Sequence, residues 1–170
     1  GSEMCIRDRY TADKFVMNAD FATGMKGLIP DKLRKKWSNK KLDQKSYSCS
    51  TYMLYLGIDK LYDTPHHQIY AAKDYQKNLR EVTDNRVTWD DPSIYVQNAC
   101  VTDSTMAPEG HSTIYVLVPA SSSHEGINWE DIKDDYMDVI LKQMENLGFE
   151  GIKDHIAVSY THLRAHETVM

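Results

Sequence analysis

The sequence has little that would direct it to nucleic acid or into a bilayer. Its 170 residues contain 20 Lys and Arg against 25 Asp and Glu, which gives a net charge of −5. Such a chain lacks the basic excess that neutralises a phosphate backbone, so we expect no nucleic-acid partner. It has no apolar run of about 18 residues, which excludes a membrane-spanning helix. Its start has no apolar stretch of the kind found in a secretory signal, so we expect no such signal.

Cysteine is also scarce, and no common catalytic motif is present. Cys5, Cys49 and Cys100 are too scattered for a disulfide framework or a zinc site, which favours a reducing compartment. The chain has no P-loop, no G-x-G-x-x-G, no G-x-S-x-G and no H-E-x-x-H. From residue spacing alone, the reaction and its catalytic residues therefore stay unidentified.

The histidine pairs do not predict a metal site either. His66 and His67 are adjacent, and adjacent side chains on a strand point to opposite faces, so we interpret them as a solvated pair. His162 and His166 are four residues apart but have no third ligand nearby. We expect no bound metal.

The two ends of the chain differ from its middle. Residues 1–9 (GSEMCIRDR) carry no hydrophobic period or capping pattern, and residues 159–170 (SYTHLRAHETVM) break off a strand-like run without a turn signal. Both resemble translated sequencing-adaptor sequence, so we interpret them as non-native tails and residues 10–158 as native. On this interpretation the chain is a fragment of a longer protein.

The middle of the chain alternates strand and helix patterns. We expect strands at residues 14–18, 47–58, 67–71, 93–101, 113–119 and 152–158. We expect helices at 23–28, from Pro30 to 37, at 74–81 and at 128–147. The strand at 47–58 is apolar on both faces, which predicts a central strand covered on both sides. The runs at 93–101 and 113–119 should pair as an antiparallel hairpin. The fold class is thus α+β, a largely antiparallel sheet covered by helices.

The longest helix has clear boundaries and a clear apolar stripe. Asn128 is expected to cap it, and Gly148 to end it in a left-handed conformation. Its stripe consists of Ile132, Tyr136, Ile140, Met144 and Leu147. This spacing predicts a helix that packs one face on the sheet.

Tyrosines are concentrated on the expected strands, at positions 52, 55, 70, 95 and 115. They could line a lipid-sized pocket on one face of the sheet. They could equally be ordinary strand packing, because tyrosine is a strong strand former.

Several motifs together resemble the bacterial-type phytoene desaturases. They are PSIYVQN at 92–98, VTD at 101–103, APEGHS at 107–112, YVLVP at 115–119, VMNAD at 16–20, SCST at 48–51, YLGID at 55–59, and the HH at 66–67 that precedes DY at 74–75. The resemblance covers essentially all of residues 14–158. The chain departs from the family pattern at Ala99-Cys100 and at Ser121, Ser122 and Ser123.

The resemblance implies an FAD-dependent enzyme that introduces double bonds into a C30 or C40 polyene. It implies a cytoplasmic protein associated peripherally with the membrane surface, with an inserted substrate domain in a flavin amine-oxidase-like fold. Residues 10–20 would end a strand of the FAD domain, and 21–158 would belong mostly to the substrate domain. The chain lacks the dinucleotide fingerprint, so we expect it to hold no FAD and to be inactive without the remaining FAD-domain segments.

The resemblance also suggests where the site lies. Ser48 and Ser50 would approach the flavin edge, while Tyr55, Tyr95 and Asn98 would lie nearer the polyene tunnel. An equally acceptable interpretation is that the two serines only interrupt the apolar face of a central strand. Two other functions stay open: a non-catalytic lipid- or carotenoid-binding module, and a related flavoprotein such as a carotene isomerase or a retinol-saturase-like enzyme.

Overall fold

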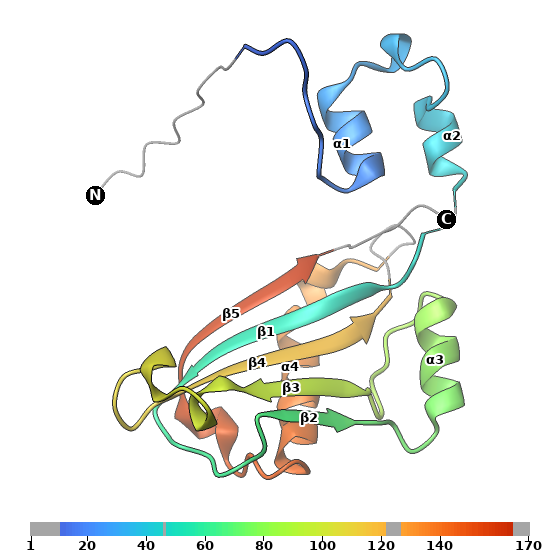
Figure 1. The fold of residues 1–170 in the computed structure, drawn as a ribbon. Coiled ribbons are helices and arrows are strands. Elements are labelled where there is room, and N and C mark those ends of the chain that lie inside the picture. The colour runs from blue at the N-terminus through green and yellow to red at the C-terminus, as the bar shows by residue number, and fades with distance from the viewer. Residues whose placement is uncertain (1–10, 46, 122–126, 165–170) are drawn as a thin grey trace. The chain divides into compact units, whose positions relative to one another are not determined.

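The computed structural model describes residues 11–45, 47–121 and 127–164, although not the side chains of 162–164 (Figure 1). The chain divides into two compact units, Gly1–Gln44 and Lys45–Met170. The predicted tail at residues 1–9 lies outside the described residues.

The first unit contains three short helices and no strand in its described part. Helix α1 spans Phe21–Leu28, the 3₁₀-helix η1 spans Asp31–Leu33, and α2 spans Asn39–Asp43. The side chain of Asp20 caps α1 by accepting a hydrogen bond from the backbone nitrogen of Thr23 at 2.7 Å. The helix expected at 23–28 is confirmed.

Two predictions in this unit are wrong. Residues 14–18 form no strand, and both Phe15 and Val16 are exposed. A strand needs a hydrogen-bonded neighbour, and the first unit offers none among its described residues. The helix expected up to residue 37 stops after one 3₁₀ turn, because Arg34 leaves helical geometry and Ser38 starts α2.

The second unit is built on a five-stranded antiparallel sheet. Its strands are β1 (Ser50–Ile58), β2 (His67–Tyr70), β3 (Ile94–Asn98), β4 (Ser112–Ala120) and β5 (Ile156–Arg164). Their order across the sheet is β2-β3-β4-β1-β5 (Figure 1). The predicted hairpin is confirmed, since β3 pairs with β4 with Tyr95 opposite Leu117. The α+β class is confirmed as well.

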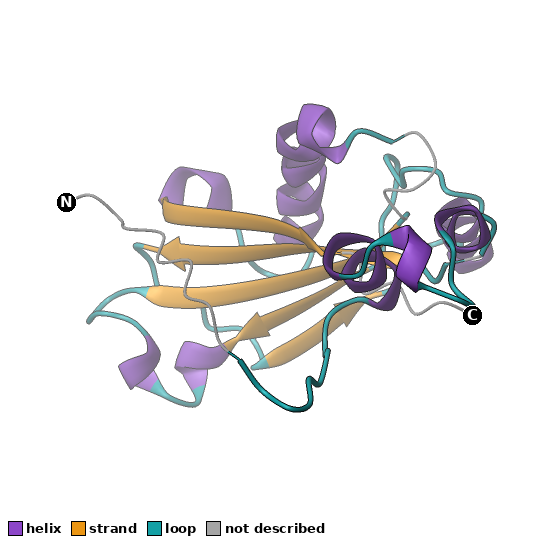
Figure 2. Cartoon of the chain, turned by 90° about the horizontal axis from the view of Figure 1, so that it is seen from above, coloured by secondary structure: helices purple, strands orange, loops and turns teal. Residues whose placement is uncertain are grey.

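Helix α4 (Trp129–Glu145) covers one face of this sheet, behind the strands in Figure 1 and along one side of the twisted sheet seen from above in Figure 2. Its predicted stripe is confirmed, because Tyr136, Ile140 and Met144 are fully buried. They pack in one core with the even-numbered residues of β1 and β4. Strand alternation explains the pattern, since every second side chain points to the α4 face.

Helix α4 begins and ends where the sequence analysis predicted. Asn128 occupies the N-cap, but its side chain makes no capping bond and donates instead to Asp131 Oδ2 at 2.6 Å. Gly148 follows the helix with φ of +93°, the left-handed conformation expected for it.

Helix α3 (Tyr75–Thr83) is capped by Asp74, whose carboxylate accepts from the backbone nitrogen of Lys77 at 2.9 Å, as the sequence predicts. The expected strand at 152–158 begins later, because Ile152–His155 forms the 3₁₀-helix η4. Strand β5 then pairs with β1 and continues to Arg164. It thus includes part of the segment interpreted as a non-native tail, and that interpretation stays a prediction.

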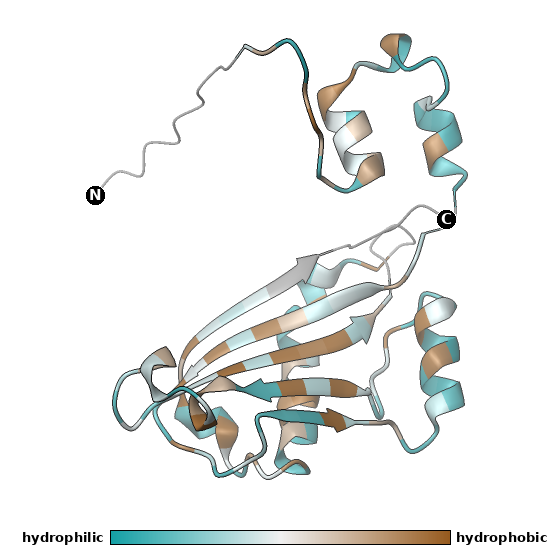
Figure 3. Cartoon of the chain, viewed as in Figure 1, coloured by the Kyte–Doolittle hydropathy of each residue, from teal (hydrophilic) through white to brown (hydrophobic). Residues whose placement is uncertain are grey.

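The sequence predicted that β1 is covered on both faces, but in the described part of the chain the face opposite α4 is not. Its odd-numbered residues are half-buried or exposed, and no described helix of the second unit packs on them. The prediction that β1 is covered on both sides is therefore wrong for the described residues. Brown apolar positions recur along β1, β3 and β4 in Figure 3, mostly at the buried even-numbered residues that point to α4. We call the face opposite α4 the open face.

Candidate functional site

A row of aromatic rings crosses the open face, with one ring on each strand. In sheet order from β2 to β5 the rings are His67, Tyr95, Tyr115, Tyr55 and Tyr160. Successive ring centroids lie 5.9, 6.1, 5.3 and 6.1 Å apart. These separations are typical of interacting aromatic pairs. We call this set the aromatic row.

Strand register produces the row. Tyr55 lies directly opposite Tyr115 on β4 and opposite Tyr160 on β5. Tyr95 pairs with Leu117, two residues along β4 from Tyr115, so its ring approaches Tyr115 diagonally. The row is therefore fixed by backbone pairing and does not depend on flexible loops.

The edge of the row at β2 is held by hydrogen bonds. The Tyr95 hydroxyl lies 2.6 Å from Nδ1 of His67, and His67 stacks on His66 with centroids 4.2 Å apart. Nδ1 of His66 lies 2.5 Å from the Thr102 hydroxyl. Each histidine thus has its own partner, and the described residues contain no group of side chains suited to a metal ion.

The Tyr115 phenol, in the middle of the row, is held in its neutral form. Burial raises the pKa of Tyr115, and the neighbouring hydroxyls of Tyr55 and Tyr95 raise it further. A row of aromatic rings presents carbon-rich surface to whatever covers it. Tyr55 itself is 41% exposed, which leaves part of that surface open.

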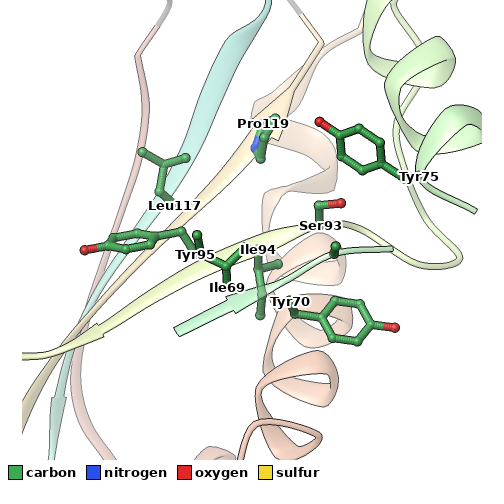
Figure 4. Close-up of a pocket in the computed structure, with 9 residues that line it drawn as sticks. Ile69, Tyr70, Tyr75, Ser93, Ile94, Tyr95, Leu117 and Pro119 are labelled. Carbon is green, nitrogen blue, oxygen red and sulfur yellow. The ribbon is translucent and has the colours of Figure 1, made fainter. Parts of the chain in front are cut away.

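A shallow groove of about 210 Å³ continues this surface toward α3 (Figure 4). Its apolar lining comes from Ile69, Tyr75, Tyr95, Leu117 and Pro119. Tyr95 belongs to both the aromatic row and the groove, so the two surfaces are continuous.

The predicted site residues fall on different faces of the sheet. Tyr55 and Tyr95 lie together on the open face, as members of the aromatic row. Asn98 lies on the α4 face, where its amide donates to the Tyr62 carbonyl at 3.0 Å and to the Thr64 hydroxyl at 3.2 Å. That position favours a structural role for Asn98, and its predicted substrate role stays a prediction.

The two serines lie at the start of β1. Ser50 is fully buried on the α4 face, opposite Ala120 of β4. Ser48 is half-buried and precedes the strand. Ser50 does not share a face with Tyr55, so the structure separates this predicted flavin-side residue from the predicted polyene-side tyrosines.

Sequence reasoning interpreted His66 and His67 as a solvated pair with side chains on opposite faces, and the placement on opposite faces is wrong, because their rings stack and His67 pairs with Tyr95. It named Tyr115 only among the tyrosines that could line a pocket. The alternation of residues 113–119 would have placed Tyr115 on the same face as Leu117. The pairing of His67 with Tyr95 had no such signal, because it depends on the register between β2 and β3.

The described residues do not form a cradle for a dinucleotide. Such a cradle needs a parallel strand followed by a glycine-rich turn and a helix N-terminus. Every strand pairing described here is antiparallel. The described α-helices start at Asp20, Ser38, Asp74 and Asn128, not at glycine turns. A flavin pyrophosphate would have to be bound by other residues.

Comparison with known proteins identifies the family. No family model matches the chain. A 4,4'-diapophytoene desaturase (4,4'-diapolycopene-forming) of Methylomonas sp is 44% identical over 145 residues, which cover 85% of this chain and 28% of the relative. An all-trans-zeta-carotene desaturase of Myxococcus xanthus is 38% identical over 149 residues, with the same two coverages. A 4,4'-diapophytoene desaturase (4,4'-diaponeurosporene-forming) of Staphylococcus aureus is 37% identical over 152 residues and 30% of its length.

The chain belongs to the carotenoid desaturase family. It spans less than a third of the length of these relatives, so it corresponds to a segment of a family member. The resemblance inferred from the sequence motifs is confirmed. The open face of the sheet, with the rings of Tyr55, Tyr95 and Tyr115, therefore belongs to a carotenoid desaturase segment.

Proposed function

We propose that the protein containing this chain is a carotenoid desaturase that introduces double bonds into a long C30 or C40 polyene, with FAD as its cofactor. The observation that carries the proposal is the open face itself. On this face a continuous row of aromatic rings lies beside an apolar groove. A hydrocarbon offers no hydrogen bonds, so such a surface suits it better than a polar one.

In this proposal Tyr55 and Tyr95 form part of the wall against which the polyene lies. Their rings are held by neighbours on both sides, so the wall is rigid before substrate arrives. Together with whatever closes the open face, they keep water away from the chain. The flavin, when bound, supplies the oxidising chemistry.

We further propose that the flavin edge lies near the start of β1, at Ser48 and Ser50. Small polar side chains there would leave room for a planar ring. Ser50 is fully buried, so a bulky substitution at this position would disturb packing before it tested flavin contact. Half-buried Ser48 is the better position for that test.

Peripheral membrane association and a cytoplasmic location belong to the same proposal, because a C30 or C40 polyene dissolves in lipid and not in water. Within the described part of the chain, no helix has the length and apolar character needed to cross a bilayer. The other proposed partners are the FAD-domain segments that this chain lacks.

The test is conversion of a polyene by the full-length protein. The protein would be loaded with FAD and incubated with C30 and C40 precursors in liposomes, and the products separated by chromatography. A desaturase gives products that have lost two hydrogens per new double bond and absorb at longer wavelength. An isomerase would change the absorption without changing the mass, and a binding module would change neither. Either of these last outcomes would overturn the proposal.

A further inference from the structure

The groove between β2, β3, β4 and α3 leaves large apolar side chains open to solvent. Ile69 is 76% exposed and Tyr75 is 53% exposed, and both belong to its lining. Figure 4 shows them among the side chains that line the groove, together with Leu117 and Pro119. Covering apolar surface is favourable by roughly 25 cal/mol per Å². An apolar occupant would therefore gain free energy by binding here.

Most polar groups of the lining already have partners. The Ser93 hydroxyl donates to Asn78 Oδ1 at 2.8 Å and accepts from the backbone nitrogen of Ala72 at 3.0 Å. The Tyr70 hydroxyl donates to Asp91 Oδ1 at 2.7 Å.

The Tyr95 hydroxyl is likewise bound, since it pairs with His67 at 2.6 Å. A ligand that needs hydrogen bonds would find few free groups in the groove, and a hydrocarbon would lose nothing there. The chemistry of the lining thus selects against polar ligands.

We propose that this groove seats a segment of the polyene substrate, with Ile69 and Tyr75 as its walls. The inference rests on the proposed function and adds a binding subsite to it. A chain lying on the aromatic row at Tyr95 enters the groove directly, because Tyr95 lines both surfaces. The volume of about 210 Å³ accommodates a segment and not a whole C30 or C40 chain.

The experiment introduces a charge into the groove of the full-length, FAD-loaded protein. Ile69→Asp places a carboxylate among the apolar walls, and Leu61→Asp is the matched control at another exposed apolar residue, 62% exposed and outside the lining. Both positions are on the surface, so neither substitution should unfold the protein, which the thermal midpoints would verify. Tyr75→Ala, which removes the other wall, is the second test variant.

We expect Ile69→Asp to raise KM for the polyene about tenfold or more, since burying a charge against hydrocarbon is costly. Tyr75→Ala should raise KM in the same direction, and Leu61→Asp should leave it within about twofold of the starting protein. If the protein desaturates polyenes and Ile69→Asp behaves like Leu61→Asp, the groove proposal is overturned while the proposed function stands.

If the protein desaturates nothing, the proposed function fails and a binding readout decides the groove. The probe is cis-parinaric acid, a fluorescent conjugated tetraene. Saturable binding that Ile69→Asp weakens and Leu61→Asp does not would support the groove. Absence of binding, or equal binding by both variants, would overturn it.

Discussion

The Tyr95 hydroxyl lies 2.6 Å from Nδ1 of His67, and the two rings stack with an interplanar angle of 24°. This pair fixes the β2 edge of the aromatic row. It also directs the Tyr95 hydroxyl toward His67, so that Tyr95 contributes its ring carbons to the lining of the groove. One hydrogen bond thus links the edge strand to the proposed polyene surface.

Tyr95→Phe should release His67 while leaving the sheet intact. The lost bond is exposed, so the free energy of unfolding should fall by less than about 1 kcal/mol. The nitrogen chemical shifts of His67, measured by NMR, should move toward those of a free imidazole. Tyr55→Phe is the control, because Tyr55 does not contact His67 in the row, and it should leave those shifts unchanged. Unchanged His67 shifts in Tyr95→Phe would show that the pair does not form in solution.

The packing of α4 on the sheet is tested by Ile140→Ala. Ile140 is fully buried between the helix and the strands, so truncation should lower the free energy of unfolding by about 2–5 kcal/mol. Leu79→Ala on α3 is the control, since the half-exposed Leu79 should cost less than about 1 kcal/mol. Denaturant midpoints measure both. A loss below about 1 kcal/mol for Ile140→Ala would contradict the described core.

Stability should fall at alkaline pH because of two buried phenols. Burial raises the pKa of Tyr52 and of Tyr136 from the usual 10.0 to about 12. A raised pKa in the folded state means that folding favours the neutral phenol. This stabilisation is complete below pH 10 and is lost as pH rises through about 12.

The measurement is the free energy of unfolding at a series of pH values from 9 to 12. Tyr136→Phe is the control, because it removes one titrating group, and its curve should fall less steeply. Absorbance at 295 nm, which follows phenol ionisation, should rise with a component near pH 12 that Tyr136→Phe reduces. A stability that is flat over this interval would contradict the burial of both rings.

Asn98→Ala should destabilise the chain. It removes the amide that donates to the Tyr62 carbonyl and the Thr64 hydroxyl inside the protein, which should cost about 1–3 kcal/mol. Gln97→Ala, the neighbouring position on the open face, should cost less. In the full-length protein, an unchanged KM for the polyene in Asn98→Ala would show that Asn98 has a structural role only. A large rise in KM without loss of stability would restore the substrate role predicted from the sequence.

The sequence predicted those elements whose pattern is local. The alternation in residues 47–58, the cap at Asp74 and the stripe of α4 depend on near neighbours, and each appears in the structure. The strand at 14–18 failed because a strand also needs a partner, and no local pattern supplies one. The helix expected after Pro30 failed for a different and local reason, because Ser38 accepts from the Lys41 backbone nitrogen and so caps a separate helix, α2.

The sequence indicated that tyrosines form the candidate site, but it did not indicate which site residues share a face or contact one another. Strand positions placed Tyr55, Tyr95 and Tyr115 among the tyrosines that could line a pocket, and the family resemblance then selected Tyr55 and Tyr95 as site residues. Asn98 was grouped with them although its even number places it on the α4 face with Val96. The contact of His67 with Tyr95 depends on the register between β2 and β3, which the sequence does not reveal.

The most direct test of the account is to label the polyene surface chemically. A C30 polyene analogue carrying a photoreactive diazirine would be irradiated with the full-length, FAD-loaded protein, and the labelled residues identified by mass spectrometry. Strand alternation provides the control, because neighbours such as Leu54 and Tyr55 point to opposite faces. The account predicts label on Tyr55, Tyr95 and Leu117. Label confined to other surfaces, with none on the open face, would contradict it.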